Sequence, residues 1–172
     1  MRVAILTVSD RCARGEAADR AGPALRAALE KLGAEVVHSA LVPDEAELIQ
    51  EQLIRWSDQV GADVVFTTGG TGLGPRDVTP EATRAVLDRL APGIAEAIRA
   101  GSQARTPTAM LSRGTAGLRG RTLIINLPGS PRGARECFEV VSPVLRHAVD
   151  MIAGRGHDTE ARGNEPPRKG DD

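Results

Sequence analysis

The sequence predicts a three-layer α/β/α fold in which helices cover both faces of a mostly parallel sheet. Short apolar runs rich in β-branched residues alternate along the chain with segments whose apolar residues recur every three or four positions. The apolar runs are continuous and do not alternate with polar residues, which is typical of strands buried on both faces. Such strands alternating with helices indicate an α/β protein.

The first strand is expected over residues 3–8, where a β-branched apolar run ends at a polar loop. A helix is expected over 20–32, because its leucines recur at spacings of four and three. Gly33 stands where glycine commonly ends a helix. The second strand is expected over 35–42.

The middle of the chain predicts a second helix, a third strand and a third helix. Apolar residues recur at spacings of four, three and four over 44–60, and Asp44 is the expected N-cap. The third strand is expected over 62–68. After a glycine-rich loop, Thr79 as N-cap and the proline that follows it predict a helix over 79–90.

The last part of the chain predicts two helices and one strand. A helix is expected over 93–104, followed by a polar connection over 112–120. The fourth strand is expected over 122–127. The final helix is expected over 131–152, and Pro143 inside it predicts a kink or break near residue 141.

The length of 172 residues favours one domain, which we expect over 1–153. The segment 154–172 has Ala161 as its only apolar side chain and is expected to be a polar tail that does not bury itself.

Composition excludes several classes of function. Lys and Arg number 22 and Asp and Glu number 23, so the net charge is -1 and the chain has no basic footprint for nucleic acid. One Trp and two Phe are too few for base-stacking platforms. The two cysteines lie far apart in the sequence, so neither a disulfide framework nor a zinc site is expected. No segment is typical of a signal sequence or a membrane span, so we expect a cytoplasmic protein without a membrane partner.

The glycine-rich loop over 67–81 is the most informative segment. It reads TTGGTGLGPRDVTPE and follows the third expected strand. Glycine lets the backbone approach a ligand closely, and the following helix would add its dipole and free N–H groups, which suits phosphate. The loop lacks the Gly-Lys-Ser/Thr of a P-loop and the spacing of a dinucleotide fingerprint. A tight strand-to-helix connection is the alternative interpretation.

Three other loops follow expected strands and have structural explanations beside functional ones. The loop over 127–133 places Ser130 directly before a proline, as a helix cap would be. The loop over 9–23 mixes the arginines Arg11, Arg14 and Arg20 with aspartates, as solvated loops also do. Asp44 is equally explained as a plain N-cap.

Two carboxylates, Asp44 and Asp77, stand near the expected starts of helices beside the glycine-rich loop. Carboxylates repel phosphates unless a cation lies between them, and Mg²⁺ binds one or two carboxylates together with substrate phosphate oxygens. The pattern therefore favours a magnesium-dependent phosphoryl or nucleotidyl transfer site, in which arginines hold the remaining oxygens.

Four motifs also carry a family resemblance. They are Thr68-Gly-Gly-Thr-Gly72, Arg76-Asp-Val-Thr-Pro-Glu-Ala-Thr83, Ala109-Met-Leu-Ser-Arg113 and Leu123-Ile-Ile-Asn-Leu-Pro-Gly129. In this order they resemble the MogA/MoaB molybdenum-cofactor biosynthesis family, which includes the G domains of plant and animal molybdopterin-insertion proteins. The resemblance implies a MogA-like fold and a molybdopterin adenylyltransferase that uses ATP and Mg²⁺ and releases pyrophosphate.

The resemblance also implies roles for individual residues. Two aspartates important for activity in the family correspond to Asp44 and Asp77, which would hold the metal. The terminal phosphate of molybdopterin would attack the α-phosphorus of ATP without a covalent enzyme intermediate. Molybdopterin and the nucleotide would be bound by Ser9, Asp10, Thr68, Gly69, Gly70, Thr71, Gly72, Arg76, Ser112, Arg113, Pro128, Gly129 and Ser130.

The resemblance leaves one rival function open, a MoaB-type protein that binds molybdopterin without catalysis. A nucleotide-dependent oxidoreductase is disfavoured because the dinucleotide fingerprint is absent. Family likeness further implies a homotrimer and a hand-off of the product to a molybdenum insertase, neither of which the residues themselves decide.

Overall fold

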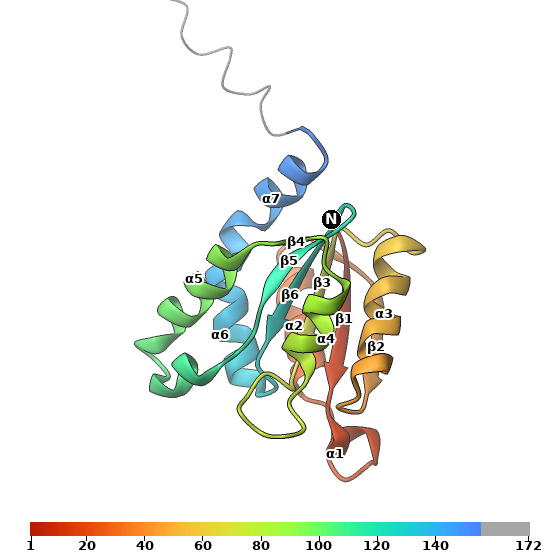
Figure 1. Ribbon diagram of the computed structural model, residues 1–172. Coiled ribbons are helices and arrows are strands. Elements are labelled where there is room, and N and C mark those ends of the chain that lie inside the picture. Colours follow the sequence, from red (N-terminus) through yellow and green to blue (C-terminus); the bar gives the residue numbers. More distant parts are fainter. Residues whose placement is uncertain (156–172) are drawn as a thin grey trace, which may run out of the picture.

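The computed structural model describes residues 1–155 and contains a six-stranded sheet flanked by helices (Figure 1). All but two residues of the expected tail lie outside this range. The strands are β1 (Arg2–Val8), β2 (Glu35–Val42), β3 (Val64–Thr68), β4 (Arg89–Leu90), β5 (Ala116–Arg119) and β6 (Thr122–Leu127). The α-helices are α1 (Asp10–Ala13), α2 (Ala21–Lys31), α3 (Ala46–Asp58), α4 (Thr79–Val86), α5 (Pro92–Gln103), α6 (Pro131–Val141) and α7 (Leu145–Ile152). Two 3₁₀ turns are η1 (Pro107–Leu111) and η2 (Ser142–Val144).

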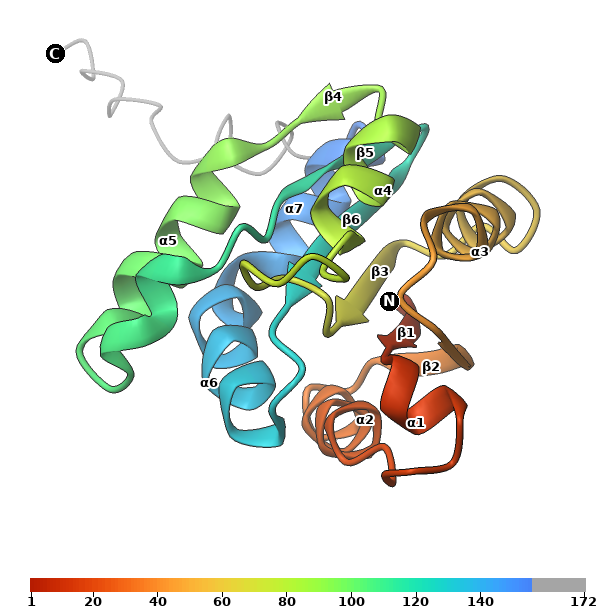
Figure 2. The ribbon, with the colours of Figure 1, turned by 60° about the horizontal axis from the view of Figure 1, so that its bottom comes forward.

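The strands follow the order β2-β1-β3-β6-β5-β4 across the sheet. The four strands β2, β1, β3 and β6 are parallel, whereas β5 runs antiparallel to β6 and β4 antiparallel to β5. The carboxyl ends of the parallel strands therefore meet at one edge of the sheet, where α1 also lies (Figure 2). Ligands of such sheets bind beyond this edge, next to the point where the strand order reverses, which here falls between β1 and β3.

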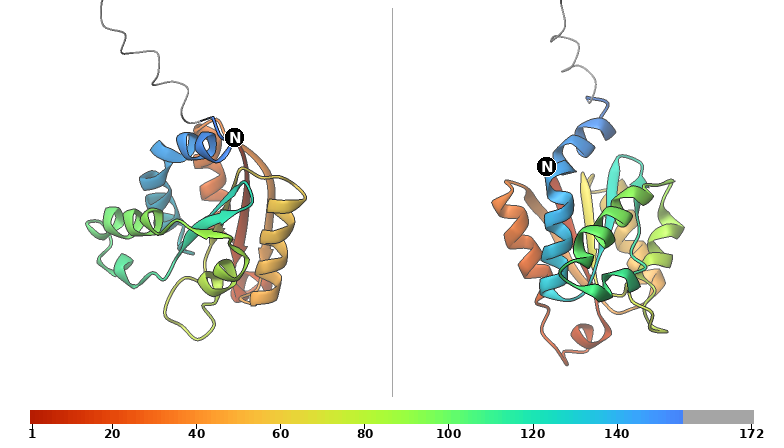
Figure 3. Two further views of the ribbon diagram at one scale, coloured as in Figure 1. Left: turned by 45° about the horizontal axis from the view of Figure 1, so that its top comes forward. Right: turned by 90° about the vertical axis from the view of Figure 1, so that its left-hand side faces the viewer.

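Two hydrophobic cores lie on opposite faces of the sheet. Val3 and Ile5 of β1 belong to a buried cluster that includes side chains of α2, α5, α6 and α7. Ala4 and Leu6 belong to a second cluster with side chains of α3 and α4. Successive side chains of a strand point to opposite faces, so each parallel strand contributes to both cores. The predicted three-layer α/β/α fold is confirmed (Figure 3).

The elements that the sequence pattern did not predict are all short: α1, η1, β4 and β5. The helix expected over 79–90 ends at Val86, and the polar connection expected over 112–120 contains β5. Strands of two and four residues have too few side chains to display a period. The predicted break in the final helix is confirmed, since α6 ends at Val141 and Pro143 lies in η2.

Gly117→Ala is expected to lower the free energy of unfolding by about 2 kcal/mol, because a buried methyl group would be forced into filled space. A Cβ at this position in β5 would lie 2.4 Å from the carbonyl oxygen of Arg89 and 2.6 Å from Cδ1 of Leu87. Urea unfolding followed by circular dichroism measures the change. Gly93→Ala in α5 is the matched control, because a Cβ there has no atom within 4 Å and alanine favours helices. Equal stability of the two variants would contradict tight packing between β4 and β5.

Candidate active site

The loops that follow β1, β2, β3 and β6 surround a cavity of about 460 Å³ at the carboxyl edge of the sheet. Its lining includes residues of α1 and of the loop after β3, and both segments lie at the same end of the molecule (Figure 2). We call it the charged cavity, because four aspartates and two arginines line it. Of the residues that the family resemblance implies, it is lined by Ser9, Asp10, Asp44, Thr68, Gly69, Gly70, Thr71, Gly72, Asp77 and Gly129.

Gly69 brings the ends of three strands together. Its N–H donates to the carbonyl oxygen of Leu127 at the end of β6, at 3.1 Å. A Cβ at Gly69 would lie 2.2 Å from the carbonyl oxygen of Val8, and its φ of +102° is one that other residues rarely adopt. The loops after β1, β3 and β6 therefore pack backbone against backbone, which requires glycine at this position.

The glycine-rich loop presents free backbone donors to the charged cavity. The N–H groups of Gly70, Thr71 and Gly72 donate to no atom of the described residues, and neither does the N–H of Gly129 in the neighbouring loop. Successive backbone N–H groups in such a turn bind anions. The loop can therefore hold phosphate oxygens with its backbone.

Helix α4 contributes fewer donors than the sequence predicted. Thr79 is not the N-cap, because α4 begins at Thr79 and Val78 is the N-cap residue without a side-chain cap. The N–H of Thr79 donates to the carbonyl oxygen of Gly70 at 3.1 Å, and Pro80 has no N–H. The expectation that the free N–H groups of this helix bind phosphate is therefore wrong at its first two positions.

Asp44 does not cap α3, since that helix begins at Ala46 and its N-cap residue Glu45 makes no side-chain cap. Instead, Asp44 pairs with Asp10 across two loops. The N–H of Asp10 donates to Oδ2 of Asp44 at 2.8 Å, and the N–H of Asp44 donates to Oδ1 of Asp10 at 3.0 Å. The alternative interpretation of Asp44 as a plain N-cap is therefore wrong.

The two carboxylates of this pair have different neighbours, which shift their pKa values in opposite directions. Arg76 donates to both carboxylate oxygens of Asp10 at 3.0 and 3.1 Å, and this contact is the main cause that lowers the pKa of Asp10. Burial is the main cause that raises the pKa of Asp44, and the carboxylates of Asp10 and Asp77 raise it further. Arg76, expected to hold substrate, is thus bound to Asp10 in this structure.

Asp77 belongs to the glycine-rich loop, and its side chain turns back toward the glycines of that loop. Its Oδ2 accepts the N–H of Gly74 at 2.8 Å, and a Cβ at Gly72 would lie 2.9 Å from the same oxygen. Asp77 and Asp44 both line the charged cavity. Within residues 1–155 no cluster of three or more His, Cys, Asp or Glu side chains is arranged to hold a metal. The two carboxylates fit a Mg²⁺ ion only together with oxygens of a bound phosphate.

A second cavity, of about 380 Å³, adjoins the first and shares Thr71 and Gly72 with it. We call it the apolar cavity, because much of its wall is aliphatic. Of the residues implied by the resemblance, Ser112, Pro128 and Ser130 line it. Its other walls include Leu73, Ala95, Ile98, Arg99, Thr106, Leu111 and Glu136. Thr106 and Glu136 are lining residues that the sequence pattern does not predict: Thr106 directly precedes the unpredicted turn η1, and Glu136 lies on α6, which packs against α5.

Ser130 and Arg113 have structural partners. Oγ of Ser130 accepts the N–H of Gly133 at 3.1 Å, which confirms the predicted cap of α6. Arg113 lies outside both cavities, donates from Nε to the carbonyl oxygen of Gly72 at 2.6 Å and pairs with Glu81. Its backbone N–H donates to the carbonyl oxygen of Thr71 at 2.9 Å. Arg113 therefore holds the glycine-rich loop in place.

Comparisons with known proteins show to which family the chain belongs. The pattern of the family described as "Probable molybdopterin binding domain" matches residues 4–147. The chain belongs to this molybdopterin-binding family. A family member from Helicobacter pylori, named molybdopterin adenylyltransferase, is 43% identical over 156 residues that span 90% of this chain and 89% of the relative.

Two further family members differ in how much of their own length matches this chain. The Drosophila melanogaster molybdenum cofactor synthesis protein cinnamon is 45% identical over 149 residues, which are 86% of this chain but 25% of that longer protein. The crystal structure of the molybdopterin biosynthesis enzyme MoaB from Thermus thermophilus is 55% identical, covers 89% of this chain and 96% of its own, and superimposes with a TM-score of 0.85. Among residues 1–155, none of the helices is both long and apolar enough for a membrane span.

Thr79→Val is expected to raise the free energy of unfolding by about 1 kcal/mol. The Thr79 side chain is fully buried and its Oγ1 has no hydrogen-bond partner among residues 1–155. An unsatisfied buried hydroxyl destabilises the folded state. Thr83→Val in the same helix is the control. Oγ1 of Thr83 accepts from Nδ2 of Asn126 at 2.9 Å, so its loss should cost about 1–3 kcal/mol. Equal destabilisation by both substitutions in urea unfolding would show that the Thr79 hydroxyl has a partner in solution.

Proposed function

We propose that this protein is a molybdopterin adenylyltransferase, which transfers AMP from ATP to the terminal phosphate of molybdopterin and releases pyrophosphate. One observation carries the proposal. The free N–H groups of the glycine-rich loop and the carboxylates of Asp44 and Asp77 line one cavity. Anion-binding backbone beside paired carboxylates suits a phosphate substrate that arrives with a divalent cation. The name of the Helicobacter pylori relative supports the same reaction.

In the proposed reaction the protein acts by positioning. An oxygen of the molybdopterin phosphate forms a bond to the α-phosphorus of ATP, and the bond from that phosphorus to the bridging oxygen breaks. The electron pair leaves with pyrophosphate, so no covalent bond to the protein is needed. The N–H groups of Gly70, Thr71 and Gly72 would stabilise the charge that develops on the non-bridging oxygens of the α-phosphate. Binding both substrates in line lowers the entropic part of the barrier.

We propose Asp44 and Asp77 as the residues that hold Mg²⁺ when ATP is bound. When bound there, the ion would neutralise charge on the phosphate oxygens. The half-buried position of Asp44 and the fixed position of Asp77 keep both carboxylates facing the cavity. Arg76 keeps Asp10 neutralised and so limits the repulsion of the incoming phosphates.

We assign the apolar cavity to the ring system of molybdopterin. Ser112, Pro128 and Ser130 line it, and its shared wall at Thr71 and Gly72 would bring the phosphate of molybdopterin next to the nucleotide. Arg113 serves this proposal indirectly, because it holds the loop that separates the two substrates.

We further propose that the protein is a cytoplasmic homotrimer and passes its product to a molybdenum insertase. The Drosophila relative supports the hand-off, because the region that matches this chain is one quarter of a longer molybdenum cofactor synthesis protein.

The second candidate is a MoaB-type protein that binds molybdopterin without catalysis. The identity of 55% to a structure named MoaB raises this candidate, although the name of that relative calls it an enzyme and so does not favour binding without catalysis. Incubation of the purified protein with molybdopterin, ATP and Mg²⁺ separates the two candidates. We expect equal amounts of adenylated molybdopterin and pyrophosphate, whereas saturable binding of molybdopterin without either product would establish the binding protein.

Asp77→Asn is expected to lower the rate of adenylated molybdopterin formation by about 100-fold or more, because the charge that would hold the cation is lost. The amide oxygen can still accept the N–H of Gly74, so the melting temperature should stay near that of the unsubstituted protein. Asp88→Asn is the matched control. Asp88 likewise accepts a backbone N–H, that of Gly120 at 2.6 Å, but lies outside both cavities. Full activity of Asp77→Asn would remove Asp77 from the proposed metal site.

A further inference from the structure

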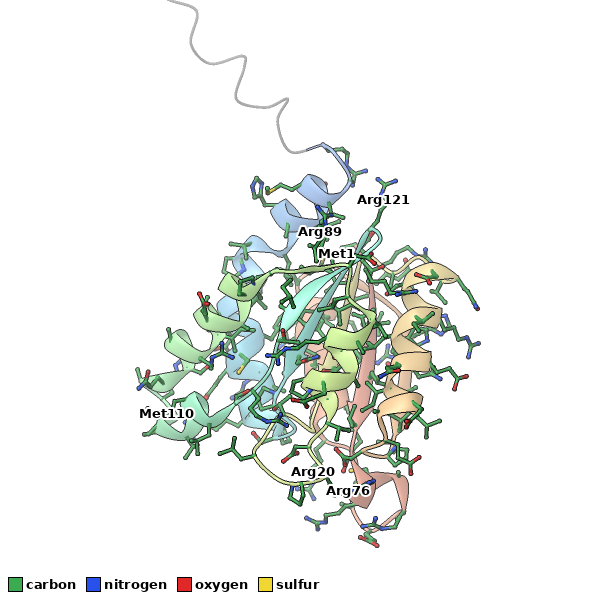
Figure 4. All side chains as sticks on the ribbon, in the orientation of Figure 1. Met1, Arg20, Arg76, Arg89, Met110 and Arg121 are labelled. Atoms are coloured by element: carbon green, nitrogen blue, oxygen red, sulfur yellow. The ribbon has the colours of Figure 1, made fainter. Side chains whose placement is uncertain are left out.

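The guanidinium groups of two arginines at the charged cavity have no partner among residues 1–155. Arg11 in α1 and Arg20, directly before α2, both line the cavity. Neither guanidinium makes a hydrogen bond or an ion pair with any of residues 1–155. Figure 4 places Arg20 at the same end of the molecule as Arg76 of the glycine-rich loop. We infer that Arg11 and Arg20 form a subsite for the β- and γ-phosphates of a nucleoside triphosphate, and so for the pyrophosphate that leaves.

Two neighbouring arginines, in contrast to this pair, form ion pairs with carboxylates. Arg14 donates to both oxygens of Glu16 at 2.7 and 3.1 Å. Arg76 is held in the same two-point manner by Asp10. Glu16 is the carboxylate close to Arg11, but Arg14 is the larger cause that lowers its pKa. Arg14 and Arg76 are thus paired, whereas Arg11 and Arg20 line the cavity without an ion pair to any of residues 1–155.

The carboxylate next to Arg20 in the chain, Asp19, accepts hydrogen bonds from other groups and does not pair with Arg20. Asp19 precedes Arg20 in the chain, and its Oδ2 accepts from Oγ1 of Thr7 at 2.7 Å while its Oδ1 accepts the N–H of Gly22 at 3.0 Å. This fixes the connection between β1 and α2 against the end of β1. Arg20 thus stands on an anchored segment, although its own side chain is exposed.

The chemistry of the proposed function requires such cations. When the bond between the α-phosphorus and its bridging oxygen breaks, the electron pair moves onto pyrophosphate, whose charge rises. Guanidinium groups are suited to this charge, because they are always protonated and bind phosphate oxygens at two points. The backbone donors at 70–72 supply one anion site, and Arg11 and Arg20 supply a second within the same cavity of about 460 Å³. The cavity therefore has separate groups for the phosphate that is transferred and for the phosphates that leave.

This inference rests on the proposed function for its reaction, but its test does not require molybdopterin. Isothermal titration calorimetry would measure the binding of pyrophosphate, ATP and AMP to the unsubstituted protein and to the variants R11A, R20A and R11A/R20A. Each single substitution is expected to weaken pyrophosphate and ATP binding by about tenfold, the loss typical of one charge-assisted hydrogen-bonding group. AMP, which lacks the β- and γ-phosphates, should bind with an affinity changed by less than about twofold.

Arg14→Ala is the matched control, because it removes an arginine of the same loop that is paired with Glu16 and does not line the cavity. Its affinity for pyrophosphate should equal that of the unsubstituted protein. Melting temperatures near the unsubstituted value verify that the variants are folded, as expected for exposed side chains without partners.

Three outcomes would overturn the subsite: no saturable binding of pyrophosphate or ATP to the unsubstituted protein, unchanged pyrophosphate affinity in R11A/R20A, or an equal loss for AMP and ATP. A loss of affinity in Arg14→Ala as large as in R20A would also overturn it. The loss would then reflect the overall positive charge of the loop and not a direct contact with phosphate. Pyrophosphate binding that depends on Arg11 and Arg20 in a protein without adenylyl transfer would contradict the proposed function and leave the subsite standing.

Discussion

The close approach of three backbones at the ends of β1, β3 and β6 is the constraint on which the site depends. A Cβ at Gly69 would lie 2.2 Å from the carbonyl oxygen of Val8, and a Cβ at Gly129 would lie 3.0 Å from Cα of Gly69. Because no side chain fits between these strand ends, the loops after β1, β3 and β6 begin next to one another. Free N–H groups and the carboxylate of Asp77 from one loop, and carboxylates from two others, consequently face the same cavity, although the three loops are far apart in the sequence.

The reciprocal pair of Asp10 and Asp44 then gives the two carboxylates different tasks. Each accepts the backbone N–H of the other, so the loops after β1 and β2 are joined and two like charges are brought close together. Arg76 compensates the charge of Asp10. Asp44 has no such partner among residues 1–155, and burial with two neighbouring carboxylates disfavours its charged form. A cation that accompanies phosphate would relieve this cost, which is a physical reason to place the proposed metal at Asp44 and the structural link at Asp10.

Most of the fold could be predicted from the sequence because its central strands are buried on both faces and therefore appear as continuous apolar runs. The four parallel strands and the break at Pro143 follow from such local patterns. The antiparallel edge could not be predicted, because β4 and β5 are short and β5 contains Gly117 and Arg119, which carry no apolar signal. The glycine-rich loop was recognisable from its composition. The exchange between Asp10 and Asp44 was not, since it joins positions 34 residues apart through backbone groups that have no sequence signature.

The arrangement of the two cavities favours direct transfer over a covalent intermediate. A serine nucleophile needs an adjacent base, yet no histidine of residues 1–155 lines either cavity. Ser9, which lines the charged cavity, is instead engaged as the cap of α1, with its Oγ accepting the N–H of Cys12 at 3.3 Å. Direct transfer requires both substrates to be bound at once. The charged and apolar cavities meet at Thr71 and Gly72, so a phosphate from each side can reach the same backbone donors without any residue having to carry the transferred group.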